Sequence, residues 1–369
     1  MKPMRYRRFV CVCLVLLLLS LLPAQALAAP PYKGVDVSKW QGTVDWAKVK
    51  QSGVEFAILR CFASRKDTTF EANYAGATAQ GIPVGAYVYM YARTPESAVK
   101  EAQNTLSALG GKALTLPLFL DVEDKDVKAL GKETVTDLML IELQIFAAAG
   151  YRAGIYTSLS HKSTDMDASR LNGYDWWIAR WTCQTTDANP KTFTFSSQSP
   201  TGSKKPDCDL WQFSNGGKGS TYGMGSTYVD LDYCYTDYIK EGPRTPNTHR
   251  YQAEVTAATC TAPGMLTLTC QDCGDTYTGA YTKPAPGHTA PNADGRCTRC
   301  GEQLVQTEDP TEPDTPEVPD TPGTPSDPQT PDSGVCKWCG KTHDGPFGWF
   351  VQILHDIFAW FQAFGHLGF

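Results

Sequence analysis

The chain has 369 residues, of which 41% are hydrophobic and 11% aromatic, enough to fill at least one full core and to form more than one domain. The formal charge of −6 becomes about −10 without the first 28 residues, which hold four basic groups and no acidic one. An acidic chain is poorly suited to nucleic acid, because such binding depends on neutralising phosphates with Lys and Arg. We therefore expect no nucleic-acid partner.

The first 28 residues predict a secretory signal peptide. Basic residues at positions 2, 5, 7 and 8 precede an apolar run over residues 9–22, and Ala26-Leu27-Ala28 has the small-x-small pattern of a cleavage site. We expect a secreted, extracellular protein that is associated with the cell envelope. An uncleaved membrane anchor is the alternative, although the run is shorter than the roughly 20 residues that span a bilayer.

Residues 30–241 predict one α/β domain, because short apolar runs alternate with amphipathic segments. The expected strands are 56–61, 83–91, 116–123, 152–157, 175–181 and 209–213, and the expected helices are 70–80, 96–109 and 135–149. This alternation indicates a mainly parallel sheet. A domain of roughly 210 residues suggests an irregular, TIM-like (β/α) barrel, whose functional groups gather at the C-terminal ends of the strands.

Two carboxylates end one of these predicted strands, in Leu118-Phe119-Leu120-Asp121-Val122-Glu123. Residues i and i+2 of a strand share a face, so we expect both acids to project into one cleft, with backbones about 6.6 Å apart. In a partly dehydrated site one acid holds its proton while the other stays ionised, which is the division that glycosidic cleavage requires. A solvated strand end or a cation site is the alternative.

Further acids and aromatic side chains lie near strand ends. Asp36 lies within an apolar strand context, and alternation places Asp230 and Asp232 on one face. Sugars bind against aromatic rings, and we expect a few of the following eight to contact a ligand. They are Trp40, Tyr87, Tyr89, Tyr91, Tyr156, Trp177, Trp181 and Trp211.

Several short motifs follow one another in a distinctive order. They are Gly34-Val35-Asp36-Val37-Ser38, Trp40-Gln41-Gly42, Phe56-Ala57-Ile58-Leu59-Arg60, Gly85-Ala86-Tyr87, Leu120-Asp121-Val122-Glu123, Gly154-Ile155-Tyr156, Trp177-Ile178-Ala179, Leu210-Trp211-Gln212-Phe213 and Val229-Asp230-Leu231-Asp232. Over about residues 32–240 the chain resembles family 25 glycoside hydrolases, the bacterial and phage lysozymes. The resemblance implies a barrel that needs no cofactor and cleaves the β-1,4 bond between N-acetylmuramic acid and N-acetylglucosamine in peptidoglycan. Asp232 departs from the family pattern, which often has Asn there.

The resemblance also implies roles for single residues. Glu123 matches the proton donor, and Asp121, Asp36 and Asp230 match the other active-site carboxylates. Asp121 would orient the 2-acetamido group for attack on the anomeric carbon, while a directly attacking carboxylate or an inverting water remains open. The residues expected to bind the sugar are Tyr87, Tyr89, Tyr156, Trp211, Gln212 and Arg60. Two other functions remain open: a non-catalytic wall-binding protein on an inactive barrel, and a glycosidase for another N-acetylated polymer such as chitin.

Residues 249–305 predict a small Cys-rich module that resembles a zinc ribbon, because they hold few apolar runs and need a cross-link to fold. Cys270-x-x-Cys273 and Cys297-x-x-Cys300, each followed by Gly, predict a structural zinc site. Cys260 and His288 are alternative ligands. Disulfides compete with zinc in an oxidising exterior.

The rest of the chain predicts a spacer and an attachment tail. Residues 306–333 have a proline at every third position from 310 to 331, eight acidic groups and no Lys or Arg, which indicates an extended polyproline rod or a disordered linker. Residues 334–369 combine Cys336, Cys339 and His343, a weaker metal site, with an aromatic amphipathic helix. We expect this helix to attach to a membrane or the cell envelope, while docking on the same chain and self-association remain alternatives.

Cysteine pairing in the first domain stays open. Without Cys11 and Cys13 of the signal peptide the chain has eleven cysteines, an odd number, so they do not all form internal disulfides. Cys61, Cys183, Cys208 and Cys234 permit three pairings, and the sequence selects none of them.

Overall fold

A computed structural model describes residues 29–247, 250–283 and 285–304. The predicted signal peptide (1–28), linker (306–333) and CxxC-containing tail (334–369) lie outside the described residues. Across the described residues, none of the helices combines the length and the apolar character that crossing a membrane requires.

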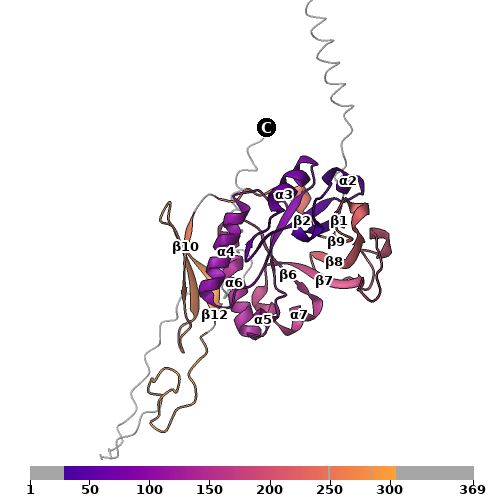
Figure 1. Cartoon of the computed structure of the whole chain (residues 1–369). Coiled ribbons are helices and arrows are strands. Elements are labelled where there is room, and N and C mark those ends of the chain that lie inside the picture. The colour runs from indigo at the N-terminus through magenta and orange to yellow at the C-terminus, as the bar shows by residue number, and fades with distance from the viewer. Residues whose placement is uncertain (1–28, 248–249, 284, 305–369) are drawn as a thin grey trace, which may run out of the picture. The chain divides into compact units, whose positions relative to one another are not determined.

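Eight strands close into a barrel (Figure 1). They are β1 (Tyr32–Val37), β2 (Phe56–Ala63), β4 (Val84–Tyr89), β5 (Leu118–Asp121), β6 (Ala153–Ser158), β7 (Asp175–Cys183), β8 (Leu210–Lys218) and β9 (Tyr228–Cys234). The sheet order β1-β9-β8-β7-β6-β5-β4-β2 is closed by pairing of β1 with β2, and β3 (Arg65–Lys66) extends β2. The six pairs from β1–β2 to β7–β8 are parallel, whereas β9 runs antiparallel to both neighbours. The predicted irregular, mainly parallel barrel is therefore confirmed.

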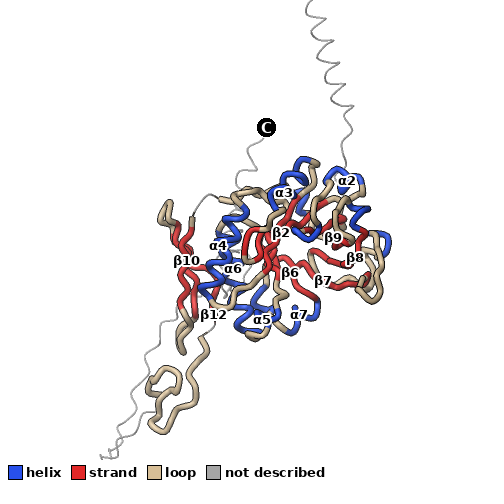
Figure 2. Tube along the Cα trace, in the orientation of Figure 1, coloured by secondary structure: helices blue, strands red, loops and turns tan. Residues whose placement is uncertain are grey.

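Helices lie outside this ring of strands (Figure 2). They are α2 (Trp46–Gln51), α3 (Phe70–Ala79), α4 (Pro95–Leu109), α5 (Lys125–Lys128), α6 (Lys132–Ala148), α7 (Leu159–Thr164) and α8 (Tyr238–Glu241), with short 3-10 turns η1 (Lys39–Gln41), η2 (Ala168–Leu171), η3 (Phe195–Ser197) and η4 (Gly219–Tyr222). The three predicted helices are confirmed to within a few residues. Thr94 caps the start of α4, and Gly110, at φ 59°, ends it in the left-handed conformation that glycine adopts without strain.

On the wall formed by β7, β8 and β9, the two connections between the strands contain the short turns η3 and η4 and no α-helix. Aromatic side chains cover it instead. Phe213 and Tyr233 stack with ring centroids 4.8 Å apart, and Trp211 and Phe195 pack beside them. This replacement of helices by an aromatic cluster is what makes the barrel irregular.

The lower part of the barrel interior is filled by large apolar side chains, including Phe56, Phe119 and Trp177. Gly34 on β1 makes room for one of them, because a Cβ atom there would lie 2.1 Å from Cζ of Phe56. The parallel strands finish at the opposite, upper end of the barrel.

The four barrel cysteines form no disulfide in the part of the chain that the structure describes. Each thiol lies within hydrogen-bond distance of a backbone carbonyl, those of Tyr87, Ser197, Pro206 and Thr236 respectively. None of the three permitted pairings is present.

The Cys-rich module contains a three-stranded antiparallel sheet of β10 (Tyr251–Thr256), β11 (Gly264–Cys270) and β12 (Thr276–Lys283). The structure groups the cysteines differently from the two predicted CxxC pairs. Cys297 and Cys300 lie with Cys260 and His288, whose ligand atoms are all within 4.8 Å of one another. Cys270 and Cys273 instead stay at the end of β11, because Cys270 is paired with Tyr251 of β10 in the sheet.

Candidate active site

A cavity of about 290 Å³ opens at the C-terminal ends of the parallel strands. It is lined by Asp36, Arg60, Tyr87, Tyr89, Asp121, Glu123, Tyr156, Trp177, Trp181, Gln212, Asn215 and Asp230. Because β9 runs antiparallel, Asp230 near its start reaches the edge at which the other strands end. The four carboxylates singled out in the sequence thus come together from β1, β5, β9 and the loop after β5.

Strand alternation and two anchors set the positions of Asp121 and Glu123. Leu120 and Val122 belong to the core between strands and helices, while Asp121 and Glu123 line the cavity. The strand itself ends at Asp121, so Glu123 lies on a loop. That loop is fixed because Val122 N donates to Tyr156 O (2.9 Å) and Asp124 caps the start of α5.

Burial raises the pKa values of the carboxyl groups in the cavity. It raises the pKa of Asp121 well above the ordinary value, and the negative charges of Glu123 and Asp36 raise it further. Burial also raises the pKa of Glu123, with the charge of Lys128 acting in the opposite direction. For Asp230 the causes are burial and then the charges of Asp36 and Glu123. The pKa values of Asp121 and Glu123 are thus both raised, and nearby negative charge adds to the effect of burial at Asp121 while the positive charge of Lys128 opposes it at Glu123.

Gln212 positions Asp36 through a short hydrogen-bond network. Its Oε1 accepts from the Tyr156 hydroxyl and from the Trp181 indole, both at 2.8 Å. Two donors on that oxygen fix the amide, so Nε2 donates to Asp36 Oδ2, also at 2.8 Å. Burial raises the pKa of Asp36 to about 6, although the hydrogen bonds from Gln212 and Asp232 act to lower it.

Asp232 lies one layer deeper and is fully buried. Its Oδ1 accepts from the indole Nε1 of Trp177 at 2.7 Å. Burial and then the charge of Asp36 raise the pKa of Asp232 well above the ordinary value, and the two side chains lie close enough to interact. The acid that departs from the family pattern is therefore a buried neighbour of Asp36 with a raised pKa.

The residues expected to bind a sugar divide into two groups. Tyr87, Tyr89, Tyr156, Gln212 and Arg60 line the cavity. Trp211, also expected to bind the sugar, does not line it. Alternation along β8 turns Gln212 inward and Trp211 outward, where its indole donates to Arg180 O at 3.0 Å.

Asn215 was missed in the sequence because it follows the end of the predicted strand. The strand β8 continues to Lys218, and irregular pairing with β9 after Gln212 breaks the alternation that would have indicated the inward position of Asn215. Asn215 Oδ1 accepts from Thr185 N at 2.9 Å, which ties β8 to the loop after β7.

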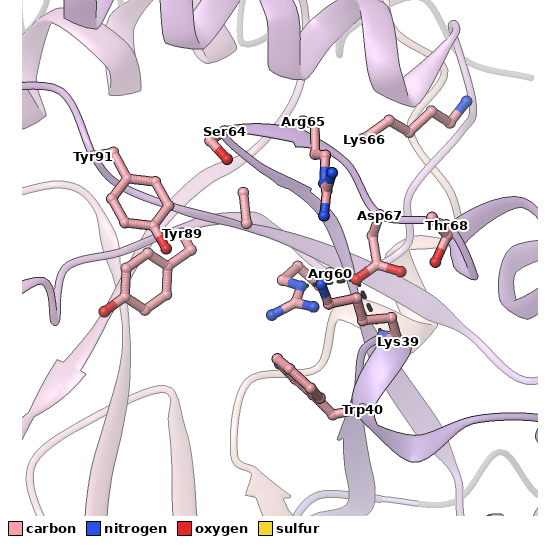
Figure 3. A pocket seen from close by; sticks show the side chains of 11 residues that line it. Lys39, Trp40, Arg60, Ser64, Arg65, Lys66, Asp67, Thr68, Tyr89 and Tyr91 are labelled. Carbon is pink, nitrogen blue, oxygen red and sulfur yellow. Dashed lines mark hydrogen bonds and ion pairs between the residues drawn. The ribbon is translucent and has the colours of Figure 1, made fainter.

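A second pocket of about 470 Å³ adjoins the first and shares Arg60 and Tyr89 with it. Figure 3 shows the rings of Tyr89 and Tyr91 on one side, Trp40 at the edge, and Lys39, Arg60 and Asp67 close together. Arg60 Nε pairs with Asp67 Oδ2 at 2.8 Å. Together these two neighbouring pockets are termed the groove.

Exposed aromatic rings border this groove. The exposed fraction is 70% for Trp40, 40% for Tyr91 and 42% for Trp181. Large apolar side chains are normally buried, so rings left exposed beside a cavity indicate a binding surface. By contrast, the side chains grouped closely enough to hold a metal ion, among the described residues, are Cys260, His288, Cys297 and Cys300, which do not line this cavity.

Comparison with known proteins gives consistent matches. The model of the family "Glycosyl hydrolases family 25" matches residues 35–222. Lysozyme M1 of Streptomyces globisporus is 32% identical over 188 residues, which cover 46% of this chain and 62% of that protein. The autolytic lysozyme of Clostridium acetobutylicum is 28% identical over 192 residues, which cover 50% of this chain and 56% of that protein. The chain thus spans less than two thirds of the length of these curated relatives.

Among solved structures, the bacterial lysozyme from Streptomyces coelicolor is 26% identical with a TM-score of 0.44, over 58% of this chain and 96% of that one. The family match extends from β1 to η4 and covers half of the chain. The chain belongs to family 25 of the glycosyl hydrolases.

Proposed function

We propose that this protein is a secreted muramidase that hydrolyses the β-1,4 bond between N-acetylmuramic acid and N-acetylglucosamine in peptidoglycan. The main support is the open cavity in which Asp36, Asp121, Glu123 and Asp230 gather beside exposed aromatic rings. The names of the relatives, a lysozyme and an autolytic lysozyme, agree with this activity. Secretion rests on the sequence of residues 1–28 alone.

In the proposed mechanism Glu123 protonates the leaving glycosidic oxygen. The carbonyl oxygen of the 2-acetamido group attacks the anomeric carbon as the glycosidic bond breaks, and Asp121 accepts a hydrogen bond from the acetamido N–H. Water then opens the cyclic intermediate, with Glu123 taking the proton. An N–H donor favours ionised Asp121, so substrate binding would move the proton preference from Asp121 toward Glu123.

The adjoining pocket supports a polymeric substrate. A cavity of about 290 Å³ holds little more than one sugar, whereas the groove continues past Tyr89 into a pocket of about 470 Å³. Trp40 and Tyr91 line that pocket and offer faces for further sugar rings. We propose that the glycan strand extends along this groove.

The decisive experiment digests purified peptidoglycan with the full chain and analyses the fragments by mass spectrometry. We expect muramic acid at the new reducing ends, and Glu123→Gln should lower the rate by about 10²-fold or more. Glu133→Gln, the same change on the outer helix α6, is the matched control and should retain the wild-type rate.

Two results would contradict this proposal. Binding of peptidoglycan without new reducing ends would identify a wall-binding protein on an inactive barrel. Faster release of sugars from chitin oligomers than from peptidoglycan would identify a glycosidase for another N-acetylated polymer.

A further inference from the structure

Four potential ligands converge in the Cys-rich module. They are the thiols of Cys260, Cys297 and Cys300 and the imidazole of His288, and their ligand atoms all lie within 4.8 Å of one another. The Sγ atoms of Cys260 and Cys297 are 3.8 Å apart, and Cys300 Sγ is 3.5 Å from His288 Nδ1. The four residues come from two segments separated by β11 and β12, so the fold and not local sequence brings them together.

These distances match tetrahedral zinc. With Zn–S bonds of about 2.3 Å and Zn–N bonds of about 2.05 Å, ideal tetrahedral angles place two sulfur atoms about 3.8 Å apart and a sulfur and a nitrogen about 3.6 Å apart. A disulfide would instead require the sulfur atoms of Cys260 and Cys297 to approach to about 2.05 Å. The observed spacing is that of ligands around a central ion.

The surroundings orient two of the ligands. The other ring nitrogen of His288, Nε2, lies 3.5 Å from Glu302 Oε2, an arrangement in which a carboxylate holds the imidazole so that Nδ1 faces the thiols. Arg299 N donates to Cys297 Sγ at 3.4 Å, and Thr289 Oγ1 lies 3.2 Å from the same sulfur. Such donors favour a thiolate over a thiol.

The segment that carries three of the ligands has little else to hold it together. Between residues 285 and 304 Cys297 is the one buried residue, and the backbone forms only isolated bridges. Gly301, at φ 75°, permits the tight turn that brings Cys300 back toward Cys297. A segment with so small a core folds only with a cross-link.

We infer that Cys260, His288, Cys297 and Cys300 bind one structural zinc ion. Four protein ligands leave no open coordination position, so the ion stabilises the fold and does not activate water. The set differs from the two CxxC pairs expected from the sequence, since Cys260 and His288 take the places of Cys270 and Cys273.

The test measures zinc in the full chain by plasma mass spectrometry after purification with zinc in the medium. His288→Ala and Cys300→Ser should each hold one zinc ion fewer than the wild type. Cys273→Ser, a matched change in the other CxxC pair, should hold as much as the wild type. His288→Cys should restore the ion, because a Cys₄ site also binds zinc, which separates loss of a ligand from a failure to fold.

Two further measurements are independent of these variants. Replacing zinc by Co²⁺ should give the intense visible absorption of a tetrahedral site with thiolate charge-transfer bands. A chelator should accelerate trypsin cleavage after Arg296 and Arg299 by about tenfold or more, because both lie in the segment that the ion cross-links.

Three outcomes would overturn the inference. One is zinc content that Cys273→Ser lowers and His288→Ala leaves unchanged, which would point to the two CxxC pairs. Another is a disulfide between Cys260 and Cys297 in peptide mapping. The third is equal zinc content in the wild type and all variants.

Discussion

The buried carboxyl of Asp232 gives a quantitative test of the electrostatics beneath the active site. Asp232 is fully buried, accepts from Trp177 Nε1 and, in its protonated form, donates to Asp36. An amide can make both hydrogen bonds, since its oxygen accepts and its nitrogen donates. Asp232→Asn therefore keeps the contacts and removes only the titration.

The pH dependence of the stability follows from the difference in proton binding between the folded and the unfolded chain. The pKa of Asp232 is raised in the folded chain above the ordinary value of 3.8, so its contribution to stability is fully present below pH 3.8 and is lost as the pH rises. Each pH unit over which only the folded state holds the proton costs about 1.4 kcal/mol. Asp232→Asn does not have this cost.

The assay is thermal unfolding of the full chain between pH 4 and pH 7. Wild type and Asp232→Asn should unfold at similar temperatures at pH 4, and at pH 7 the variant should unfold at a higher temperature, by about 2–4 °C for each kcal/mol that the wild type loses. Asp126→Asn, an exposed change in an ion pair with Arg93, should follow the wild type across the range. Parallel curves for wild type and Asp232→Asn would show that Asp232 is ionised in the folded protein and would refute this reasoning.

Three further predictions concern the cavity, the groove and the outer face of β8. Gln212→Leu removes the donor to Asp36 and should lower kcat/KM on peptidoglycan by about 10–100-fold with the fold retained in circular dichroism; an unchanged rate would remove Gln212 as a positioning residue. Trp40→Ala should raise KM on peptidoglycan by about 3–10-fold without shifting the unfolding temperature, because the ring is 70% exposed. Trp211→Phe should lower the free energy of unfolding by about 1–2 kcal/mol, because the hydrogen bond to Arg180 O is lost, and should leave KM unchanged. A raised KM would show that Trp211 does contact the substrate.

The barrel was predictable from the sequence because its parallel strands are buried on both faces. Such strands appear as continuous apolar runs, and β2, β4 and β6 lie close to the predicted ranges. Because both faces of such a strand are apolar, the sequence does not show which way each side chain points. Trp211 and Gln212 are neighbours in one apolar strand, and only packing of the aromatic cluster outside β8 shows that the polar residue faces the cavity.

The proposed metal ligands show a different limit on what the sequence alone predicts. A CxxC spacing predicts that two sulfurs lie on one turn, and this local geometry is present at both pairs, where a backbone N–H donates to the sulfur of Cys270 and of Cys297. Which CxxC turn lies beside which other ligands depends on β11, because its pairing with β10 keeps Cys270 in the sheet. Spacing alone therefore predicts the chemistry of the ligands but not their combination.

The antiparallel strand β9 connects the irregular fold to the proposed chemistry. Because it enters the barrel from the open end, Asp230 pairs with Asp36 across the β1–β9 ladder, and Asp232 follows one layer below. If the last strand ran parallel to its neighbours, only residues at its C-terminal end would lie at the open rim of the barrel. Here three acids lie on two adjacent strands beside Asp121 and Glu123, and burial raises the pKa of each, so positive charge that develops nearby would favour their ionised forms. Cleavage of a glycosidic bond produces such charge at the anomeric carbon, so we expect this arrangement to favour the transition state over the bound sugar.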